Sequence, residues 1–264
     1  MKPGLLVASV AIALCARASA DMFPIVDVRY GYLIGAIESG KWIEPTDATS
    51  SVKPGTKLHV YGLTGEVGTA QVVKIDTENE PCPDRPVVKL RPAKMKNGAI
   101  AFSASWNPSP RKAKPADAKL PQHVNAVREL LRAHGLPNPV VHISQIVSVD
   151  LDGDGQDEFV ISATHYKNGD NIPDESSANT YSCVMIERMV NGKPAAELVD
   201  GEFYPKTKSD SAPNRFQIAA LLDLNGDGKI DIAVRSAYYE GDEISVYEYQ
   251  PSGIKKALSA GCGL

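Results

Sequence analysis

Two short acidic segments of this sequence combine residue types and spacing that suit a divalent cation. The first, "DLDGDGQDE", runs from Asp150 to Glu158, and the second, "DLNGDGKID", runs from Asp223 to Asp231. The second begins 73 residues after the first (223 − 150). Both place an oxygen-bearing side chain at positions 1, 3, 5 and 9, and glycine at positions 4 and 6. The pattern therefore predicts two metal sites of one design.

Calcium is the ion that these loops favour, because it takes about six to eight oxygen ligands from carboxylates, amides, backbone carbonyls and water. The ligands expected in the first loop are Asp150, Asp152, Asp154, the backbone carbonyl of Gln156, and Glu158. Those expected in the second loop are Asp223, Asn225, Asp227, the backbone carbonyl of Lys229, and Asp231. A helical EF-hand would need glutamate at position 12, where the sequence has Ile161 and Val234. The loops are therefore expected between β-strands.

Two other interpretations of the loops stay open. Asp-Gly pairs favour hairpin turns without any metal. The second loop carries three carboxylates at ligand positions against four in the first, so it is the better candidate for a turn that has lost its ion. For the same reason we expect the first loop to bind calcium more tightly.

The two loops lie inside a longer repeat. At the offset of 73 residues, "IVSVDLDGDGQDEFVISATHYKNG" aligns with "AALLDLNGDGKIDIAVRSAYYEGD". An apolar run precedes each loop and another follows it, and "TYSCVMIERM" and "EISVYEYQ" add a third run. Each copy therefore predicts a strand, the acidic loop, a strand, a turn and a strand.

At these residues the chain resembles FG-GAP/VCBS repeats, the calcium-loop β units of integrin α-chain propellers and of many exported bacterial proteins. The resemblance rests on "DLDGDGQDEFVIS" and "DLNGDGKIDIAVRS" and extends from about Val140 to Tyr249. It implies propeller-blade-like, four-stranded units with calcium in the turn between the first two strands. Integrin-type propellers have about seven blades and this chain shows two, so the resemblance implies a two-unit β assembly instead of a closed propeller.

The rest of the chain predicts the elements that accompany the repeats. Residues 21–105 hold short β-rich runs separated by Gly, Pro and Asn, which predicts a small N-terminal antiparallel β domain. Residues 106–121 are rich in proline and lysine and predict a solvated linker. Residues 122–264 hold one helix and the two repeats, so the predicted fold class is mainly β. The helix is expected in "PQHVNAVRELLRAHGLP", with an apolar stripe and Gly135 at its end.

The first 20 residues, "MKPGLLVASVAIALCARASA", predict a secretory signal peptide, with a lysine, an apolar stretch and a small-residue cleavage site. The protein is therefore expected to be exported, to the periplasm or outside the cell. No other apolar run approaches the length of a membrane span. The net charge of −4 gives no electrostatic reason to expect nucleic acid or an anionic membrane as a partner.

Cleavage after Ala20 would leave three cysteines, Cys82, Cys183 and Cys262. They permit one disulfide in any of three pairings. Cys183 lies in an apolar run typical of a buried free thiol, whereas Cys82 and Cys262 lie in segments that look irregular and exposed. These surroundings favour a Cys82–Cys262 disulfide.

No catalytic motif accompanies the loops. The five histidines lack zinc spacing, and the sequence has no G-x-S-x-G element and no phosphate-binding glycine loop before a helix. A glycosidase needs two facing carboxyl groups. The loose candidates for such a pair are Glu38, Glu66, Glu187, Glu197, Glu202, Glu240 and Asp242. No catalytic residue is predicted.

Three functions follow as hypotheses. The first is an exported non-enzymatic protein with two structural calcium ions, which binds a protein or a glycan through its loops. The long polar segment "HYKNGDNIPDESSANTYS" is either a binding loop of this kind or a mobile excursion. The second hypothesis is an exported hydrolase acting on polysaccharide, with calcium as scaffold. The third is an adhesion or assembly subunit that uses an exposed β edge.

Overall fold

The computed structural model describes residues 21–169, 171–190, 193–209, 211–250 and 252–263. The expected signal peptide, residues 1–20, lies outside the described residues. Within them, sixteen strands form three antiparallel sheets beside one α-helix and one 3-10 helix, which confirms the prediction of a mainly β chain. No helix in this part of the chain is long and apolar enough to cross a membrane.

The N-terminal sheet has seven strands in the order β3-β2-β1-β7-β4-β5-β6. Its strands are β1 Met22–Asp27, β2 Leu33–Glu38, β3 Lys41–Ile43, β4 Lys57–Gly62, β5 Gly65–Asp76, β6 Val87–Arg91 and β7 Ile100–Phe102, with the 3-10 helix η1 at Asp47–Ser51. The sheet curls back on itself, because Val88 N–H donates to the carbonyl of Gly31 at 2.7 Å and so joins β6 to the start of β2. Gly31 has φ +82°, and a Cβ there would lie 2.5 Å from the Val88 carbonyl. This closure requires glycine.

The two repeats form two further sheets. The first sheet has the order β12-β11-β10-β9-β8 and the second the order β13-β14-β15-β16. The strands of the first are β8 Lys114–Pro115, β9 Ile143–Val149, β10 Glu158–His165, β11 Thr180–Val190 and β12 Lys193–Tyr204. Those of the second are β13 Arg215–Leu222, β14 Asp231–Tyr238, β15 Gly241–Gln250 and β16 Gly253–Gly263. Each copy thus contributes four consecutive antiparallel strands, one more than the periodicity predicts.

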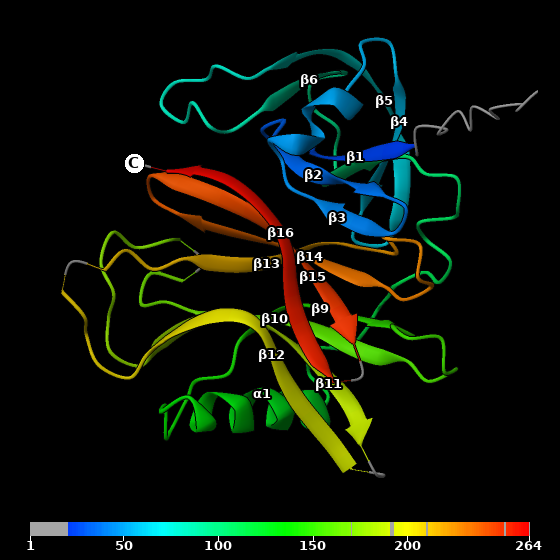
Figure 1. The fold of residues 1–264 in the computed structure, drawn as a ribbon. Coiled ribbons are helices and arrows are strands. Elements are labelled where there is room, and N and C mark those ends of the chain that lie inside the picture. The colour runs from blue at the N-terminus through cyan, green and yellow to red at the C-terminus, as the bar shows by residue number, and fades with distance from the viewer. Residues whose placement is uncertain (1–20, 170, 191–192, 210, 251, 264) are drawn as a thin grey trace, which may run out of the picture.

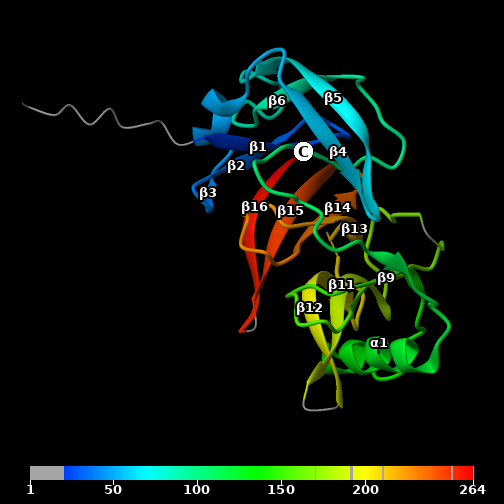
Figure 2. The ribbon, with the colours of Figure 1, turned by 90° about the vertical axis from the view of Figure 1, so that its right-hand side faces the viewer.

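The three sheets are stacked, with the N-terminal sheet at one end, β13–β16 in the middle and β8–β12 at the other end (Figures 1 and 2). One apolar core lies between the two repeat sheets and contains Val160 and Val184 of one with Ile232 and Val234 of the other. A second core joins β13–β16 to the N-terminal sheet. The repeats are therefore buried against each other and against the N-terminal strands.

The helix α1, Pro121–Ala133, covers the outer face of the β8–β12 sheet (Figure 1). It begins with proline and ends before Gly135 at φ +87°, as its sequence predicts. Val127, Leu130 and Leu131 of the predicted stripe are buried. His123 is buried as well, and its Nδ1 lies 2.7 Å from Glu187 Oε2 on β11.

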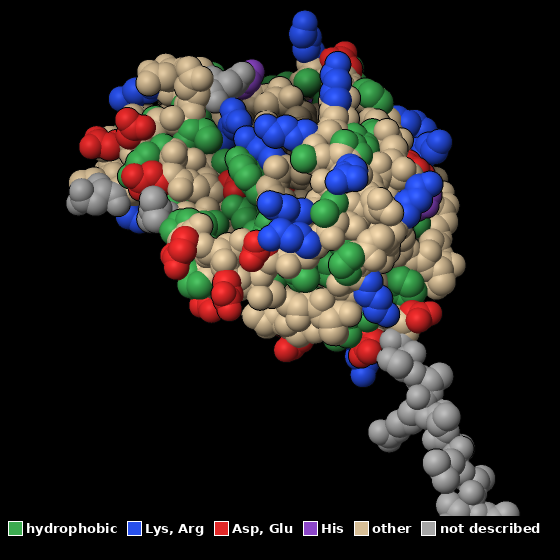
Figure 3. All heavy atoms as spheres, turned by 90° about the horizontal axis from the view of Figure 1, so that it is seen from above, with side chains coloured by type: hydrophobic (Ala, Val, Ile, Leu, Met, Phe, Trp, Pro, Cys, Tyr) green, Lys and Arg blue, Asp and Glu red, His purple; other side chains and the backbone are tan. Residues whose placement is uncertain are grey.

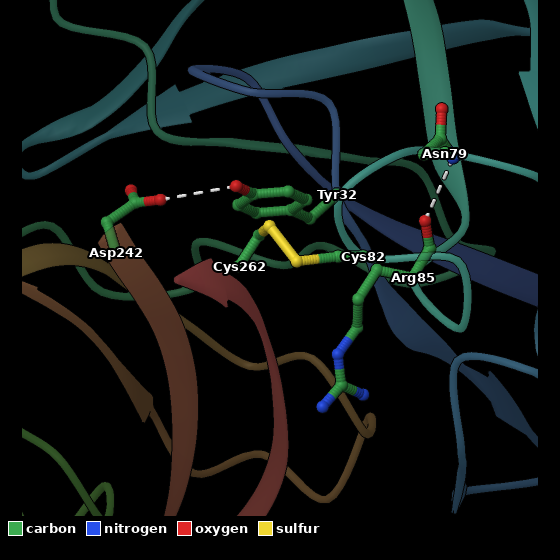
Figure 4. Close-up of a disulfide and its surroundings, with 6 residues drawn as sticks. All are labelled: Tyr32, Asn79, Cys82, Arg85, Asp242 and Cys262. Atoms are coloured by element: carbon green, nitrogen blue, oxygen red, sulfur yellow. Dashed lines mark hydrogen bonds between the residues drawn. A yellow bond between two sulfur atoms is a disulfide. The ribbon is translucent and has the colours of Figure 1, made fainter. Parts of the chain in front are cut away.

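A disulfide and a buried ion cluster fasten the N-terminal sheet to β13–β16. Cys82 is bonded to Cys262, as predicted, and Cys183 is a buried free thiol (Figure 4). Cys262 lies in β16, so the expectation of an irregular segment there is wrong. Beside the disulfide, buried Arg235 pairs with Asp27 of β1 and, at 2.7 Å, with Asp242 of β15.

The long polar segment after β10 is held by the connection between β12 and β13. Ser176 is buried, its hydroxyl donates to the Lys208 carbonyl at 2.7 Å, and its N–H donates to the Ser211 carbonyl at 2.9 Å. Asn179 N–H donates to the Tyr204 carbonyl at 2.7 Å. These contacts disfavour the interpretation of a mobile excursion.

Candidate metal sites in two repeated loops

Each acidic loop connects the first two of the four strands that its repeat contributes. The first loop joins β9 to β10, and the second joins β13 to β14, so residues 150–158 and 223–231 hold equivalent places. Both strand pairs are antiparallel neighbours that bury apolar side chains between the sheets. Each loop is therefore anchored at both ends by a packed strand.

The first residue of each loop organises its backbone. In the first loop, the two carboxylate oxygens of Asp150 accept hydrogen bonds from Gly153 N–H at 2.6 Å and Gly155 N–H at 3.1 Å. Asp223 does the same for Gly226 at 2.7 Å and Gly228 at 3.0 Å. The four glycines have φ between +78° and +88°, the left-handed region that glycine adopts without strain.

The other loop positions repeat the same contacts. Position 3 accepts from the N–H of position 5, at 3.2 Å for Asp152 and 3.0 Å for Asn225. Position 5 accepts from the N–H of position 7, at 2.7 Å for Asp154 and 2.9 Å for Asp227. Position 9 accepts from the N–H of position 2, where the acceptors are Glu158 at 2.8 Å and Asp231 at 3.0 Å. Five hydrogen bonds from backbone N–H groups to loop side chains thus recur at equivalent positions in the two loops.

In the first loop, carboxylate oxygens of Asp150, Asp152 and Glu158 lie within 4.8 Å of one another. These are positions 1, 3 and 9 of the predicted ligand set. Asp154, at position 5, is not part of this group, and both of its oxygens accept hydrogen bonds from Gln156. The carbonyls expected at Gln156 and Lys229 stay predictions, because only the N–H groups of these residues have described contacts.

The second loop is more buried than the first at positions 1 and 3, where Asp150 and Asp152 of the first loop are only half-buried. Asp223 is 4 % exposed, Asn225 7 % and Asp231 1 %. One carboxylate oxygen of Asp231, Oδ1, is buried without a hydrogen-bond partner. An unpaired buried carboxylate oxygen is costly, and a cation bound to this atom would offset that cost.

Burial and mutual repulsion act on the carboxyl groups of both loops. Burial raises the pKa of Asp231 well above its ordinary value, and the charges of Asp227 and Asp223 raise it further. Burial also raises the pKa of Asp223. In the first loop, the pKa of Glu158 is raised by burial and by its acidic neighbours. A divalent cation would compensate these charges and release the repulsion.

The segment 106–121 contacts both loops, which the sequence did not predict. Trp106 Nε1–H donates to the Asp223 carbonyl at 2.9 Å, and Asp223 N–H donates to the Pro108 carbonyl at 2.8 Å. The Arg111 guanidinium donates to the carbonyls of Asp150 and Leu151 in the first loop and of Gly228 in the second. The prediction of a solvated linker is therefore wrong for Trp106 and Arg111. A tryptophan in a polar, proline-rich segment was the one sequence signal for this packing.

The loops also touch each other directly. Ile230 N–H of the second loop donates to the Leu151 carbonyl of the first at 2.8 Å. The same carbonyl accepts from Arg111 Nη2 at 3.2 Å. An ion in one loop would therefore stiffen a backbone that the other loop shares.

Five of the seven loose glycosidase candidates have structural partners. Glu66 lies 2.7 Å from His59 Nδ1, Glu187 pairs with His123, and Glu197 pairs with Arg188 at 3.0 Å. Glu202 accepts from Tyr204 and Asn214, and Asp242 accepts from Arg235. Comparison with family models, with curated proteins and with solved structures finds no match for this chain.

Proposed function

We propose that this is an exported, non-enzymatic β-repeat protein of the FG-GAP/VCBS kind, whose two loops each bind a structural calcium ion. One observation carries the proposal. The two loops share five hydrogen bonds from backbone N–H groups to side-chain oxygens at equivalent positions. A plain Asp-Gly turn needs only one or two of these contacts, and it needs no acidic residue at position 9.

The ligand chemistry supports calcium among the common metal ions. The candidate side-chain ligands are carboxylate or amide oxygens, without a nitrogen or sulfur ligand that zinc or copper would favour. Magnesium demands near-ideal octahedral geometry and keeps several waters, whereas calcium accepts a flexible, carboxylate-rich loop. The unpartnered Asp231 Oδ1 supports retention of the ion by the second loop.

The position of the loops supports a structural role for the ions. The first loop, the second loop and the segment from Trp106 to Arg111 meet where the two repeat sheets pack together. Calcium in both loops would hold these three pieces of chain in one arrangement. The stabilised assembly would then present a binding surface for a glycan or a protein outside the cytoplasm.

The alternative of a calcium-stabilised polysaccharide hydrolase has less support. A cavity beside β15 and β16 contains Asp200, Asp242 and Glu243, three carboxyl groups in one place. Each of them accepts hydrogen bonds from protein groups: Asp200 from Tyr247, Asp242 from Arg235, and Glu243 from Ser245 and Lys256. Such contacts favour a structural role over proton transfer.

Thermal unfolding in EGTA and in about 5 mM calcium tests the proposal. For two extracellular-type sites with Kd of about 10⁻⁴ M, calcium should raise the Tm by about 5–15 °C. Magnesium at the same concentration is the matched control and should give a much smaller shift. Equal Tm values in EGTA and in calcium would mean that the loops are turns that bind no ion, and would refute the proposal. Release of reducing ends from a polysaccharide by the purified protein would support the hydrolase instead.

A further inference from the structure

A cavity of about 790 Å³ lies where the three sheets meet. Its walls come from the β1–β2, β4–β5 and β6–β7 connections of the N-terminal sheet and from β9, β13 and β14 of the repeats. Its volume falls in the range of small-molecule binding sites, and junctions between packed units are common places for them. The calcium loops do not line it.

A second cavity of about 530 Å³ adjoins the first and shares Val28, Arg29 and Tyr30 with it. The basic residues lining the two cavities are Arg29, Lys89, Arg91, Lys94 and Arg235. Among the described residues, no aspartate or glutamate lines either one. The chain as a whole has a net charge of −4, so this basic lining does not follow from composition.

Four of these five cations form no salt bridge among the described residues, although the charges of Arg29 and Lys89 act on the carboxyl groups of Asp242 and Asp76. Arg235 is neutralised by Asp27 and Asp242, but Arg29, Lys89, Arg91 and Lys94 form no salt bridge in this part of the chain. Figure 3 shows lysine and arginine side chains gathered around a hollow on the face that it views. The linings of the two cavities therefore present these four cations to an anionic ligand.

An aromatic ring stands between the two cavities. Tyr30 is 45 % exposed, and its ring lies 5.1 Å from the Arg29 guanidinium and 5.8 Å from that of Arg235. Tyr32 stacks against it at 5.6 Å between ring centroids. The ring is thus held in place by its neighbours while nearly half of the residue stays exposed. Uncharged hydrogen-bonding groups of Thr64, Asn97 and Gln217 line the larger cavity.

We propose that the two cavities together bind an acidic oligosaccharide, such as a chain of uronic acids. The carboxylates of the sugars would pair with Arg29 and Lys94 in the larger cavity and with Lys89 and Arg91 in the smaller one. A sugar ring would pack on Tyr30, and its hydroxyl groups would bond to Asn97 and Gln217. The combination of spaced cations, one open ring and neutral polar groups fits a charged sugar better than a peptide, which needs apolar pockets or a strand edge.

This inference names the ligand class of the binding protein proposed above and relies on that proposal for its biological role. The site is built from residues outside the calcium loops, so the two proposals can fail separately. Absence of a calcium effect on Tm would refute the calcium sites alone. Absence of sugar binding to a protein that calcium stabilises would refute this inference alone.

Calorimetric titration with trigalacturonate, in calcium buffer at low salt, tests the site. We expect binding with a Kd of about 10⁻⁴ M that weakens as salt is added. The double variant Arg29→Gln/Lys94→Gln should weaken binding by about tenfold or more, since each lost charge-assisted bond counts for that order. Tyr30→Ala should weaken it as well. Lys255→Gln, an exposed cation on β16, is the matched control and should bind as the parent does.

Several results would overturn the inference. The methyl ester of trigalacturonate has the same sugar rings without charge, and equal binding of the ester would remove the role of the cations. Unchanged binding by the double variant would place the sugar elsewhere. Tighter binding of oligoglutamate or of a short oligonucleotide than of trigalacturonate would assign the basic cavities to another class of polyanion. Circular dichroism of each variant checks its fold, which should persist because the changed side chains are exposed.

Discussion

The two loops have one internal design and different surroundings. The first carries four carboxylates at ligand positions and lies largely exposed, whereas the second carries three and is covered by Trp106 and by the neighbouring sheet. Charge count alone favours tighter calcium binding by the first loop. Because the second loop is more buried, leaving its carboxylates without an ion should destabilise the fold more than leaving those of the first loop without one. The loop with the higher calcium affinity therefore need not be the loop that matters more for folding stability.

The largest expected effect comes from removing the cover of the second loop. Trp106→Ala deletes a half-buried ring that lies against Gly226 and donates to the Asp223 carbonyl. The variant should lose about 3 kcal/mol of unfolding free energy, measured by urea denaturation in calcium. Calcium affinity should fall at the second loop and stay at the first. Equal loss at both loops would show that their surroundings do not differ in the way described.

The next effect concerns the unpartnered carboxylate of the second loop. Asp231→Asn keeps an oxygen to accept from Leu224 N–H but removes the buried charge. In EGTA the variant should gain about 1–3 kcal/mol of stability, because it no longer buries an uncompensated charge. In about 5 mM calcium it should lose the roughly 2 kcal/mol that ion binding contributes. Urea denaturation in EGTA and in calcium measures the expected gain and the expected loss of stability.

Asp157→Asn is the matched control for this change. Asp157 lies in the first loop at a position outside the ligand set, where it accepts from Ser148. Its replacement should leave the calcium response unchanged. A loss of stability by Asp231→Asn in EGTA would contradict the cation site in the second loop.

A reciprocal exchange at position 3 tests the difference in ligand charge between the two loops. Asp152→Asn gives the first loop the amide of the second, and Asn225→Asp gives the second loop the carboxylate of the first. The first exchange should weaken calcium binding by about tenfold, since ligand charge tunes affinity in such loops. The second should lower stability in EGTA, because the new carboxylate would face Glu248, which now accepts from Asn225 at 3.2 Å. Calorimetric titration and thermal unfolding measure the two effects.

The smallest expected effect is a difference in stability between alanine variants at two glycines of the second loop. Gly226 and Gly228 both have positive φ, so alanine costs about 1–2 kcal/mol at either position. A Cβ on Gly226 would also lie 3.1 Å from the Trp106 ring, whereas Gly228 faces open space. Gly226→Ala should therefore be less stable than Gly228→Ala by about 1 kcal/mol. Equal stabilities would mean that the Trp106 ring moves away from the added methyl group without a cost in stability.

Much of the fold could be predicted from local sequence patterns. Alternating apolar runs placed the strands on both sides of each loop, and proline and Gly135 marked the two ends of α1. The spacing of Asp150, Asp152 and Glu158 anticipated three carboxylates that do converge. Spacing could not show that Asp154 turns away, because its hydrogen bonds to Gln156 depend on the folded loop.

Long-range packing was the part that sequence could not supply. Trp106 and Arg111 come from a proline-rich segment, and only the folded chain brings them to loops that are 39 to 117 residues away in sequence. Cys262 likewise lies in a strand, although the glycines on both sides of it made the segment look irregular in the sequence. Such contacts arise from the stacking of the sheets, for which no local pattern exists.

The most direct test of the central claim is the number of calcium ions bound per chain. Calorimetric titration of the purified protein, stripped of metal by EGTA and dialysis, should give two ions. Glu158→Gln and Asp231→Asn should each reduce the number to one, and the double variant should bind none. A stoichiometry of zero for the parent protein, or one that neither substitution changes, would contradict the account.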